Sequence, residues 1–158
     1  MYLKNIKDTQ NFSKKISKII NMGDIIFLYG EIGVGKTTFV RFFINSIEKE
    51  NKIKNSEVLS PTFNIVYDYN IGSKRILHYD LYRLKNNKDI SQLGIFETSK
   101  EHIKIIEWPE LIKSKPENRI DIIFKYSKLK DAREVTINGF GKWKDYKLNE
   151  IKNTAHSR

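Results

Sequence analysis

A glycine-rich segment constrains what this chain can fold into more than any other part of the sequence. Residues 30–37 read G-E-I-G-V-G-K-T and satisfy the pattern G-x-x-x-x-G-K-[ST] at every fixed position. An apolar run, Ile25–Tyr29, precedes the pattern, and apolar side chains follow it at helical spacing as far as Ile47. This order of strand, loop and helix predicts a phosphate-binding loop. The alternative is a glycine turn without a ligand.

Each fixed position of this pattern has a physical reason. Glycines let the backbone turn so that successive N–H groups face phosphate oxygens, and the following helix adds the positive end of its dipole. The Lys36 ammonium would reach the β- and γ-phosphates, and the Thr37 hydroxyl would hold Mg²⁺. The segment therefore predicts a site for a nucleotide with Mg²⁺.

The rest of the chain alternates between helix-like and strand-like segments. One apolar pattern predicts a helix that is capped at Asp8–Thr9 and stops before Gly23, and further helices are expected at 36–47, 90–101 and 110–113. Strands are expected at Ile25–Tyr29, Ile65–Tyr69, Lys74–Tyr79, Ile103–Ile106, Ile120–Tyr126 and Arg133–Asn138. We interpret residues 1–141 as one α/β domain and the polar residues 142–158 as a loosely ordered basic tail.

The composition limits the cellular setting. The chain contains no cysteine, which excludes disulfides and thiolate metal sites. We find no hydrophobic signal segment at the N-terminus and no apolar run of about 18 residues, so we expect a cytoplasmic protein outside the membrane. The formal net charge of +10 favours polyanions such as RNA, unless the lysines are simply scattered over the solvated surface.

Two acidic residues that follow apolar strands are candidates for the rest of the site. Asp80 and Glu107 each stand where such a run ends, and open α/β sheets bind ligands at the carboxyl ends of their strands. Each is otherwise an ordinary strand-end acid. The segment S-P-T-F at 60–63 offers Thr62 as a switch-like contact to a γ-phosphate, with a plain proline turn as the alternative. Trp108 either packs, shields a neighbouring metal site from water, or docks a partner.

Four motifs stand in order: G-E-I-G-V-G-K-T-T at 30–38, S-P-T-F at 60–63, H-Y-D-L-Y-R at 78–83 and E-W at 107–108. This ordered set resembles the bacterial TsaE (YjeE) family over residues 5–141. The resemblance implies a three-layer, P-loop NTPase-like α/β fold with a mostly parallel central sheet and antiparallel additions. It also implies ATP and Mg²⁺ as cofactors, slow ATP hydrolysis, and TsaD and TsaB as partners. That pair transfers a threonylcarbamoyl group to the adenosine 3′ of the tRNA anticodon, and tRNA is expected to be reached through this complex.

The resemblance also assigns roles to individual residues of this chain. Nucleotide contacts would come from Thr9, Glu31, Ile32, Gly33, Val34, Gly35, Lys36, Thr37, Thr38 and Arg133. The Mg²⁺ site would be formed by Thr37, Glu107 and Asp80. Catalytic roles fall to Asp80, Glu107, Lys36, Thr62 and Trp108. From the residues alone, Thr9 is equally a helix cap and Arg133 equally a surface cation.

Two other functions stay open at this point. A small-molecule kinase with a phosphate loop usually carries an arginine-rich lid, whereas Arg75, Arg83, Arg119 and Arg133 of this chain are scattered and form no visible lid cluster. A nucleotide-switched RNA-binding module would account for the positive charge and the basic tail. A GTPase is disfavoured, because the sequence contains neither N-K-x-D nor D-x-x-G.

Overall fold

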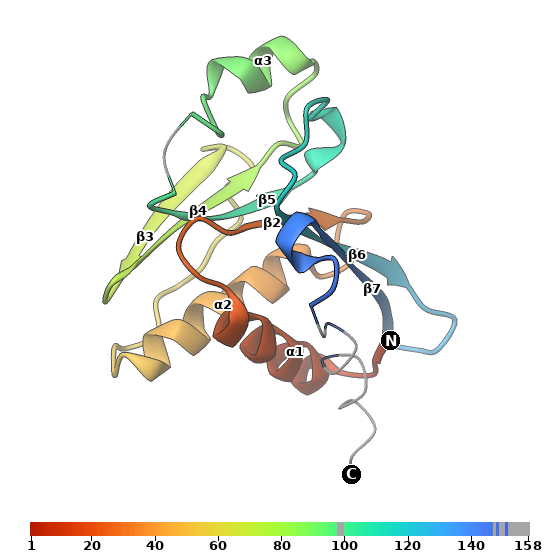
Figure 1. Cartoon of the computed structure of the whole chain (residues 1–158). Coiled ribbons are helices and arrows are strands. Elements are labelled where there is room, and N and C mark those ends of the chain that lie inside the picture. Colours follow the sequence, from red (N-terminus) through yellow and green to blue (C-terminus); the bar gives the residue numbers. More distant parts are fainter. Residues whose placement is uncertain (98–99, 147, 149–150, 152–158) are drawn as a thin grey trace.

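The structure is a computed structural model that describes residues 1–97, 100–146, 148 and 151. Its centre is one mixed sheet of seven strands in the order β1-β7-β6-β2-β5-β4-β3 (Figure 1). The strands are β1 (Tyr2–Leu3), β2 (Ile25–Tyr29), β3 (Val66–Ile71), β4 (Lys74–Asp80), β5 (Ile103–Glu107), β6 (Arg119–Tyr126) and β7 (Arg133–Phe140).

The four central strands are parallel. Strand β2 lies between β5 and β6 and is parallel to both, and β4 is parallel to β5 on its other side. The outer strands β3, β7 and β1 join in antiparallel pairs. The expected mostly parallel centre with antiparallel additions is confirmed. As a result, β2, β4, β5 and β6 all direct their carboxyl ends to the same edge of the sheet.

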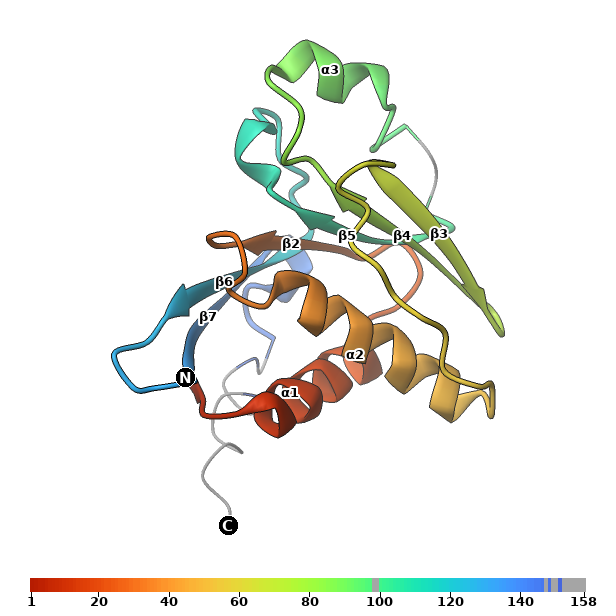
Figure 2. The ribbon, with the colours of Figure 1, turned by 180° about the vertical axis from the view of Figure 1, so that it is seen from behind.

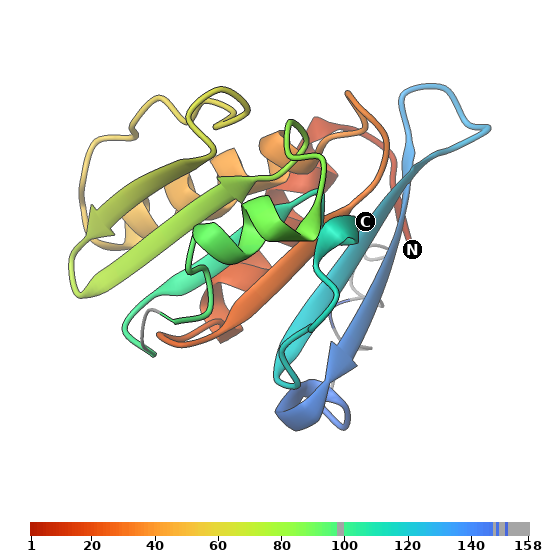
Figure 3. The same ribbon diagram turned by 90° about the horizontal axis from the view of Figure 1, so that it is seen from above.

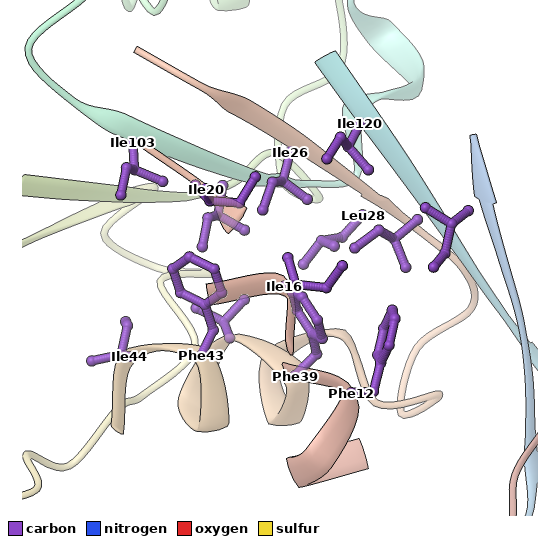
Figure 4. Packing of buried hydrophobic residues seen from close by; sticks show 14 of the residues in the cluster. Phe12, Ile16, Ile20, Ile26, Leu28, Phe39, Phe43, Ile44, Ile103 and Ile120 are labelled. Atoms are coloured by element: carbon purple, nitrogen blue, oxygen red, sulfur yellow. The ribbon is translucent and has the colours of Figure 1, made fainter. Parts of the chain in front are cut away.

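Two helices, α1 (Ile6–Ile19) and α2 (Lys36–Glu50), lie side by side on one face of the sheet (Figure 2). Their apolar stripes pack on β2, and Phe12 and Phe39 bring their ring centres within 5.4 Å of each other. Figure 4 shows these rings below Ile26 and Leu28 of the strand. This packing fixes the start of α2 directly below the carboxyl end of β2.

The opposite face has a thinner cover. The short helix α3 (Asn87–Gln92) crosses this face (Figure 3), and a 3₁₀ turn, η1 (Pro109–Leu111), follows β5. Ile90 and Ile112 from these segments are buried against Phe27 of the sheet. The expected three-layer α/β arrangement is therefore confirmed. Within the described ranges, no helix is long and apolar enough to cross a membrane.

Several element boundaries differ from the sequence-based expectation. Helix α1 begins at Ile6, ahead of Asp8–Thr9, because the Asn5 side chain caps it by accepting a hydrogen bond from the Asp8 N–H. The helix expected at 90–101 is instead α3, after which the chain turns at Gly94 with φ +58°. Strand β1 was not predicted, because two residues are too few to show an alternating pattern.

The C-terminal segment differs from the expected loose tail in the part that the structure describes. It begins with the 3₁₀ turn η2 (Gly141–Trp143), and the Trp143 side chain is 4% exposed. Leu148 and Ile151 are also buried in the main core. These three side chains thus belong to the main core cluster, which also contains residues of α1 and β7, and the order of the remaining tail stays a prediction. Residues 147, 149–150 and 152–158 lie outside the described part.

The buried indole of Trp143 leads to a stability prediction. Trp143→Ala should lower the free energy of unfolding by about 2–4 kcal/mol, because it removes a large side chain from the core and leaves a cavity. Lys144→Ala, at the exposed neighbouring position, should change it by less than about 0.5 kcal/mol. Urea unfolding followed by circular dichroism measures both. A loss below about 1 kcal/mol for Trp143→Ala would contradict the packing described for this segment.

Candidate nucleotide-binding site

The glycine-rich loop connects the carboxyl end of β2 to the first residue of α2. Gly33 and Gly35 adopt φ angles of +76° and +119°, a region that side chains other than glycine rarely enter. The loop therefore wraps around the N-terminus of α2, where the positive end of the helix dipole lies. Backbone turns of this kind, at the start of a helix, are suited to anions.

The Lys36 side chain is held inside the loop. It is 4% exposed, and its ammonium donates hydrogen bonds to the carbonyl oxygens of Gly30 and Glu31 while lying 4.0 Å from the centre of the Trp108 ring. Burial lowers the pKa of Lys36, and the carboxylates around it, with Glu107 the foremost, act in the opposite direction. An anion that enters the loop would replace two weak carbonyl partners with a full opposite charge.

A chain of hydrogen bonds joins the start of α2 to the end of β5. The Thr37 hydroxyl lies 3.0 Å and 3.2 Å from the two carboxylate oxygens of Glu107. The Nε2 atom of His78, a fully buried residue of β4, lies 2.8 Å from one of these oxygens. Because an ionised carboxylate can only accept, we assign the proton to Nε2. Glu107 is thus held between a helix residue and a strand residue.

A second set of hydrogen-bond donors surrounds the Asp80 carboxylate at the end of β4. One carboxylate oxygen accepts hydrogen bonds from the hydroxyls of Thr62 (2.7 Å) and Ser60 (3.1 Å). The other oxygen accepts from the backbone N–H of Tyr82 at 2.9 Å. The S-P-T-F segment is therefore tied to Asp80, and not merely a proline turn. In the parallel register, Asp80 lies opposite Glu107.

Trp108 follows Glu107 in a strained backbone conformation. Its φ and ψ angles are +58° and +54°, a left-handed geometry that costs roughly 1–3 kcal/mol for a residue other than glycine. The turn directs the indole toward Lys36 and sets it against the Tyr82 ring, with 4.9 Å between ring centres. The strain places an aromatic wall beside the phosphate loop.

These side chains line one cavity of about 280 Å³ at the carboxyl edge of the sheet. Its lining residues are Ile32, Gly33, Gly35, Lys36, Thr37, Thr38, Ser60, Thr62, Asp80, Tyr82, Glu107 and Trp108. Most of the sequence-predicted site residues are thus brought together. Loop N–H groups, an ammonium, a hydroxyl and two carboxylates are the groups that bind phosphates and a divalent cation.

A second cavity of about 320 Å³ lies on the other side of the loop. It is lined by Thr9 and Arg133, which are predicted nucleotide contacts, and by Val34 of the loop. Gly33, Gly35 and Thr38 line both cavities. A ligand of sufficient length at the loop would therefore contact both cavities. Glu31 does not line either cavity and contributes its carbonyl oxygen to Lys36.

Four contributors to the site were not predicted as site residues: His78, Ser60, Tyr82 and Tyr126. His78 stands two residues before Asp80, so the alternation of a strand places both on one face, a signal that the sequence does contain. The contact of the Tyr126 hydroxyl with the loop depends on tertiary packing of β6, and the sequence carries no local sign of it.

The side chains of this site suit a metal ion that is coordinated both by the protein and by a bound ligand. Among the residues that the structure describes, no three His, Cys, Asp or Glu side chains form a cluster able to hold a metal ion alone. Mg²⁺ often takes only one or two protein ligands and completes its shell with water and phosphate oxygens. The hydroxyl of Thr37 and the carboxylate of Glu107, already in contact, match that kind of donor set.

Comparison with known protein families identifies the family of this chain. The family model described as threonylcarbamoyl adenosine biosynthesis protein TsaE matches residues 3–135. The chain belongs to the TsaE family. It is thus a member of a family of proteins of threonylcarbamoyladenosine biosynthesis, as its four sequence motifs suggested.

Individual relatives cover most of the chain. The TsaE protein of Rickettsia typhi is 39% identical over 111 residues, which are 70% of this chain and 74% of the relative. The TsaE protein of Bacillus subtilis is 32% identical over 139 residues, with 87% and 83% covered. The crystal structure of Bacillus subtilis YdiB is similar in fold, with a TM-score of 0.73, 25% identity, and 99% of this chain and 95% of that chain covered.

The lowered pKa of Lys36 leads to a prediction about protons. A bound polyphosphate would raise this pKa, so between the lowered and the raised value the ammonium is deprotonated in the free protein and protonated in the complex. ATP binding should therefore take up protons in an alkaline pH range below the ordinary lysine pKa, and a pH series locates this range. Calorimetry in two buffers of different ionisation enthalpy measures the number of protons taken up for each ATP bound. Lys36→Arg, which stays charged, should show less uptake, and equal uptake in both proteins would contradict the assignment.

Proposed function

We propose that this protein is a Mg²⁺-dependent ATPase of the cytoplasm. Its hydrolysis of ATP would support the transfer of a threonylcarbamoyl group to the adenosine 3′ of the tRNA anticodon by the partner proteins TsaD and TsaB. The observation that carries the proposal is the joining of the phosphate loop to two strand-end carboxylates in one cavity. Membership of the TsaE family supplies the tRNA-modification context.

Phosphate binding would come from the loop and Lys36. The ammonium now contacts the Gly30 and Glu31 carbonyls, and a short movement of a flexible side chain would bring it to a phosphate oxygen. The loop N–H groups and the N-terminus of α2 add positive potential without any titration. The second cavity, with Thr9 and Arg133, would take the nucleoside part of ATP.

Thr37 and Glu107 would hold Mg²⁺, and when bound this ion neutralises charge on the phosphates during hydrolysis. The chain's own part is to keep the two oxygen donors in place. The hydrogen bond from His78 fixes the Glu107 carboxylate from the buried side of the sheet. A direct metal contact by Asp80 stays a prediction, since its oxygens are engaged by Thr62, Ser60 and Tyr82.

Asp80 and Thr62 would orient the water molecule that attacks the γ-phosphate. The carboxylate is an acceptor for a water proton, and the Thr62 hydroxyl that it holds lies in the same cavity as Lys36. The ring of Trp108 covers one side of the ammonium and limits access of bulk water.

The placement of the arginines favours hydrolysis over a kinase reaction. A kinase lid brings arginines over the phosphates, but none of the residues that line the 280 Å³ cavity is an arginine. Arg75 pairs with Asp68, and Arg119 pairs with Asp121. Arg83 lies over the ring of Phe63, beside Thr62, and does not line the cavity. The lack of a lining arginine supports water as the acceptor.

The decisive test is Glu107→Gln in a reconstituted reaction with TsaD, TsaB, ATP, Mg²⁺ and tRNA. The substitution keeps the shape of the side chain and removes its charge, so ATP hydrolysis should fall by roughly 100-fold and tRNA modification should fall with it. Glu117→Gln removes a charge at an exposed position outside both cavities and should leave both rates unchanged.

Two results would contradict the proposal in different ways. If Glu107→Gln supports tRNA modification as well as the unmodified protein, the metal role of Glu107 is wrong. If the unmodified protein neither hydrolyses ATP nor promotes modification, the proposed function itself is wrong. Phosphorylation of a small metabolite in place of hydrolysis would favour the kinase.

A further inference from the structure

Two side chains of the β6–β7 hairpin hold the outer side of the phosphate loop. The Tyr126 hydroxyl donates a hydrogen bond to the carbonyl oxygen of Ile32 at 2.8 Å. Arg133 donates from Nε to the carbonyl oxygen of Val34 at 2.9 Å, and its guanidinium lies 4.9 Å from the centre of the Tyr126 ring. The hairpin thus donates hydrogen bonds to two alternate carbonyl oxygens of the loop.

These two contacts determine where the next N–H groups point. The chain has no cis peptide bond in the described residues, and in a trans peptide the C=O and the following N–H point in opposite directions. Carbonyls of Ile32 and Val34 that are held toward the hairpin therefore direct the N–H groups of Gly33 and Gly35 away from it. Both glycines line the 280 Å³ cavity, where phosphates are expected.

The two glycines of the loop make it necessary to restrain the direction of these N–H groups. The φ angles of Gly33 and Gly35 are positive, and a glycine adopts positive and negative φ with similar ease. The peptide units before these residues can therefore rotate, which would turn a carbonyl oxygen toward the phosphates in place of an N–H. One repelling carbonyl in place of a donor would weaken binding of an anion. Hydrogen bonds to the carbonyls oppose that rotation.

We propose that Tyr126 is a positioning residue for phosphate binding, which acts with Arg133 to keep the Gly33 and Gly35 N–H groups directed at the phosphates. The inference rests on the proposed function, in that the loop must bind the phosphates of ATP. Tyr126 itself does not touch the ligand, since it lines neither of the two cavities. It acts through the backbone of the loop.

Tyr126 allows a clean test because it is not a core residue. Its side chain is 50% exposed, and Tyr126→Phe removes only the hydroxyl that contacts the loop. Tyr2 is a matched control, because it is 46% exposed, also lies in a strand, and lies outside the loop and both cavities. Arg133 is less suitable, because it also lines the second cavity and its substitution would combine two effects.

The experiment measures the dissociation constants of ATP with Mg²⁺ and of adenosine, the latter by displacement of a fluorescent nucleotide. Tyr126→Phe should raise the dissociation constant of ATP by about threefold to tenfold, the effect of one hydrogen bond. The constant of adenosine should not change, because adenosine has no phosphate to meet the loop. The kcat of hydrolysis at saturating ATP should also stay the same, and Tyr2→Phe should alter none of these values.

A second measurement reports on the loop without a nucleotide. Backbone NMR order parameters of Gly33 and Gly35 should fall in Tyr126→Phe and stay unchanged in Tyr2→Phe. Unchanged ATP affinity in Tyr126→Phe, alongside tight binding by the unmodified protein, would overturn this inference and leave the proposed function intact. Equal losses for ATP and adenosine would also overturn it, since they would indicate a general disturbance. Absence of ATP binding by the unmodified protein would overturn both.

Discussion

The parallel pairing of β2, β5 and β4 is the constraint on which the site depends. Its register places Leu28 of β2 opposite Glu107, and Glu107 opposite Asp80, so both carboxylates emerge beside the phosphate loop. Side chains alternate between the two faces of a strand, and a shift of one residue would turn Glu107 to the face covered by α3. The buried aliphatic residues of these strands hold that register, because a one-residue slip would move each of them from one core cluster to the other and disrupt the packing on both faces. The apolar core thus sets the distance between Thr37 and Glu107.

The site departs from ideal structure in three places, and each departure involves a residue that contributes to the proposed chemistry. Trp108 keeps a left-handed backbone, Lys36 is buried with a lowered pKa, and His78 is buried with its Nδ1 atom unpartnered. Such features lower stability and persist when the surrounding packing compensates for them. Trp108 and Lys36 line the same cavity, where the indole covers the ammonium. His78 lies behind that cavity and holds the carboxylate that, on the proposed function, would bind the metal.

Much of this arrangement can be predicted from the sequence. The phosphate-loop motif depends on local backbone chemistry, so its position was clear, and β2 was predicted with its observed bounds. Asp80 and Glu107 could be found because strand ends carry ligands in such sheets. What could not be predicted depends on distant contacts. The hydrogen bond from Tyr126 to Ile32 joins residues that are 94 positions apart in the sequence. The burial of Trp143 requires the folded surface of the core. A polar segment that carries a few apolar residues has no periodicity to reveal such docking.

The most direct test of the central claim is a crystal structure with Mn²⁺ and a non-hydrolysable ATP analogue, in which anomalous scattering locates the metal. The account predicts the triphosphate in the 280 Å³ cavity, with the metal bound by Thr37 and Glu107 and with Lys36 moved from the Gly30 and Glu31 carbonyls to a phosphate oxygen. A nucleotide bound elsewhere, or a metal peak remote from both Thr37 and Glu107, would contradict it.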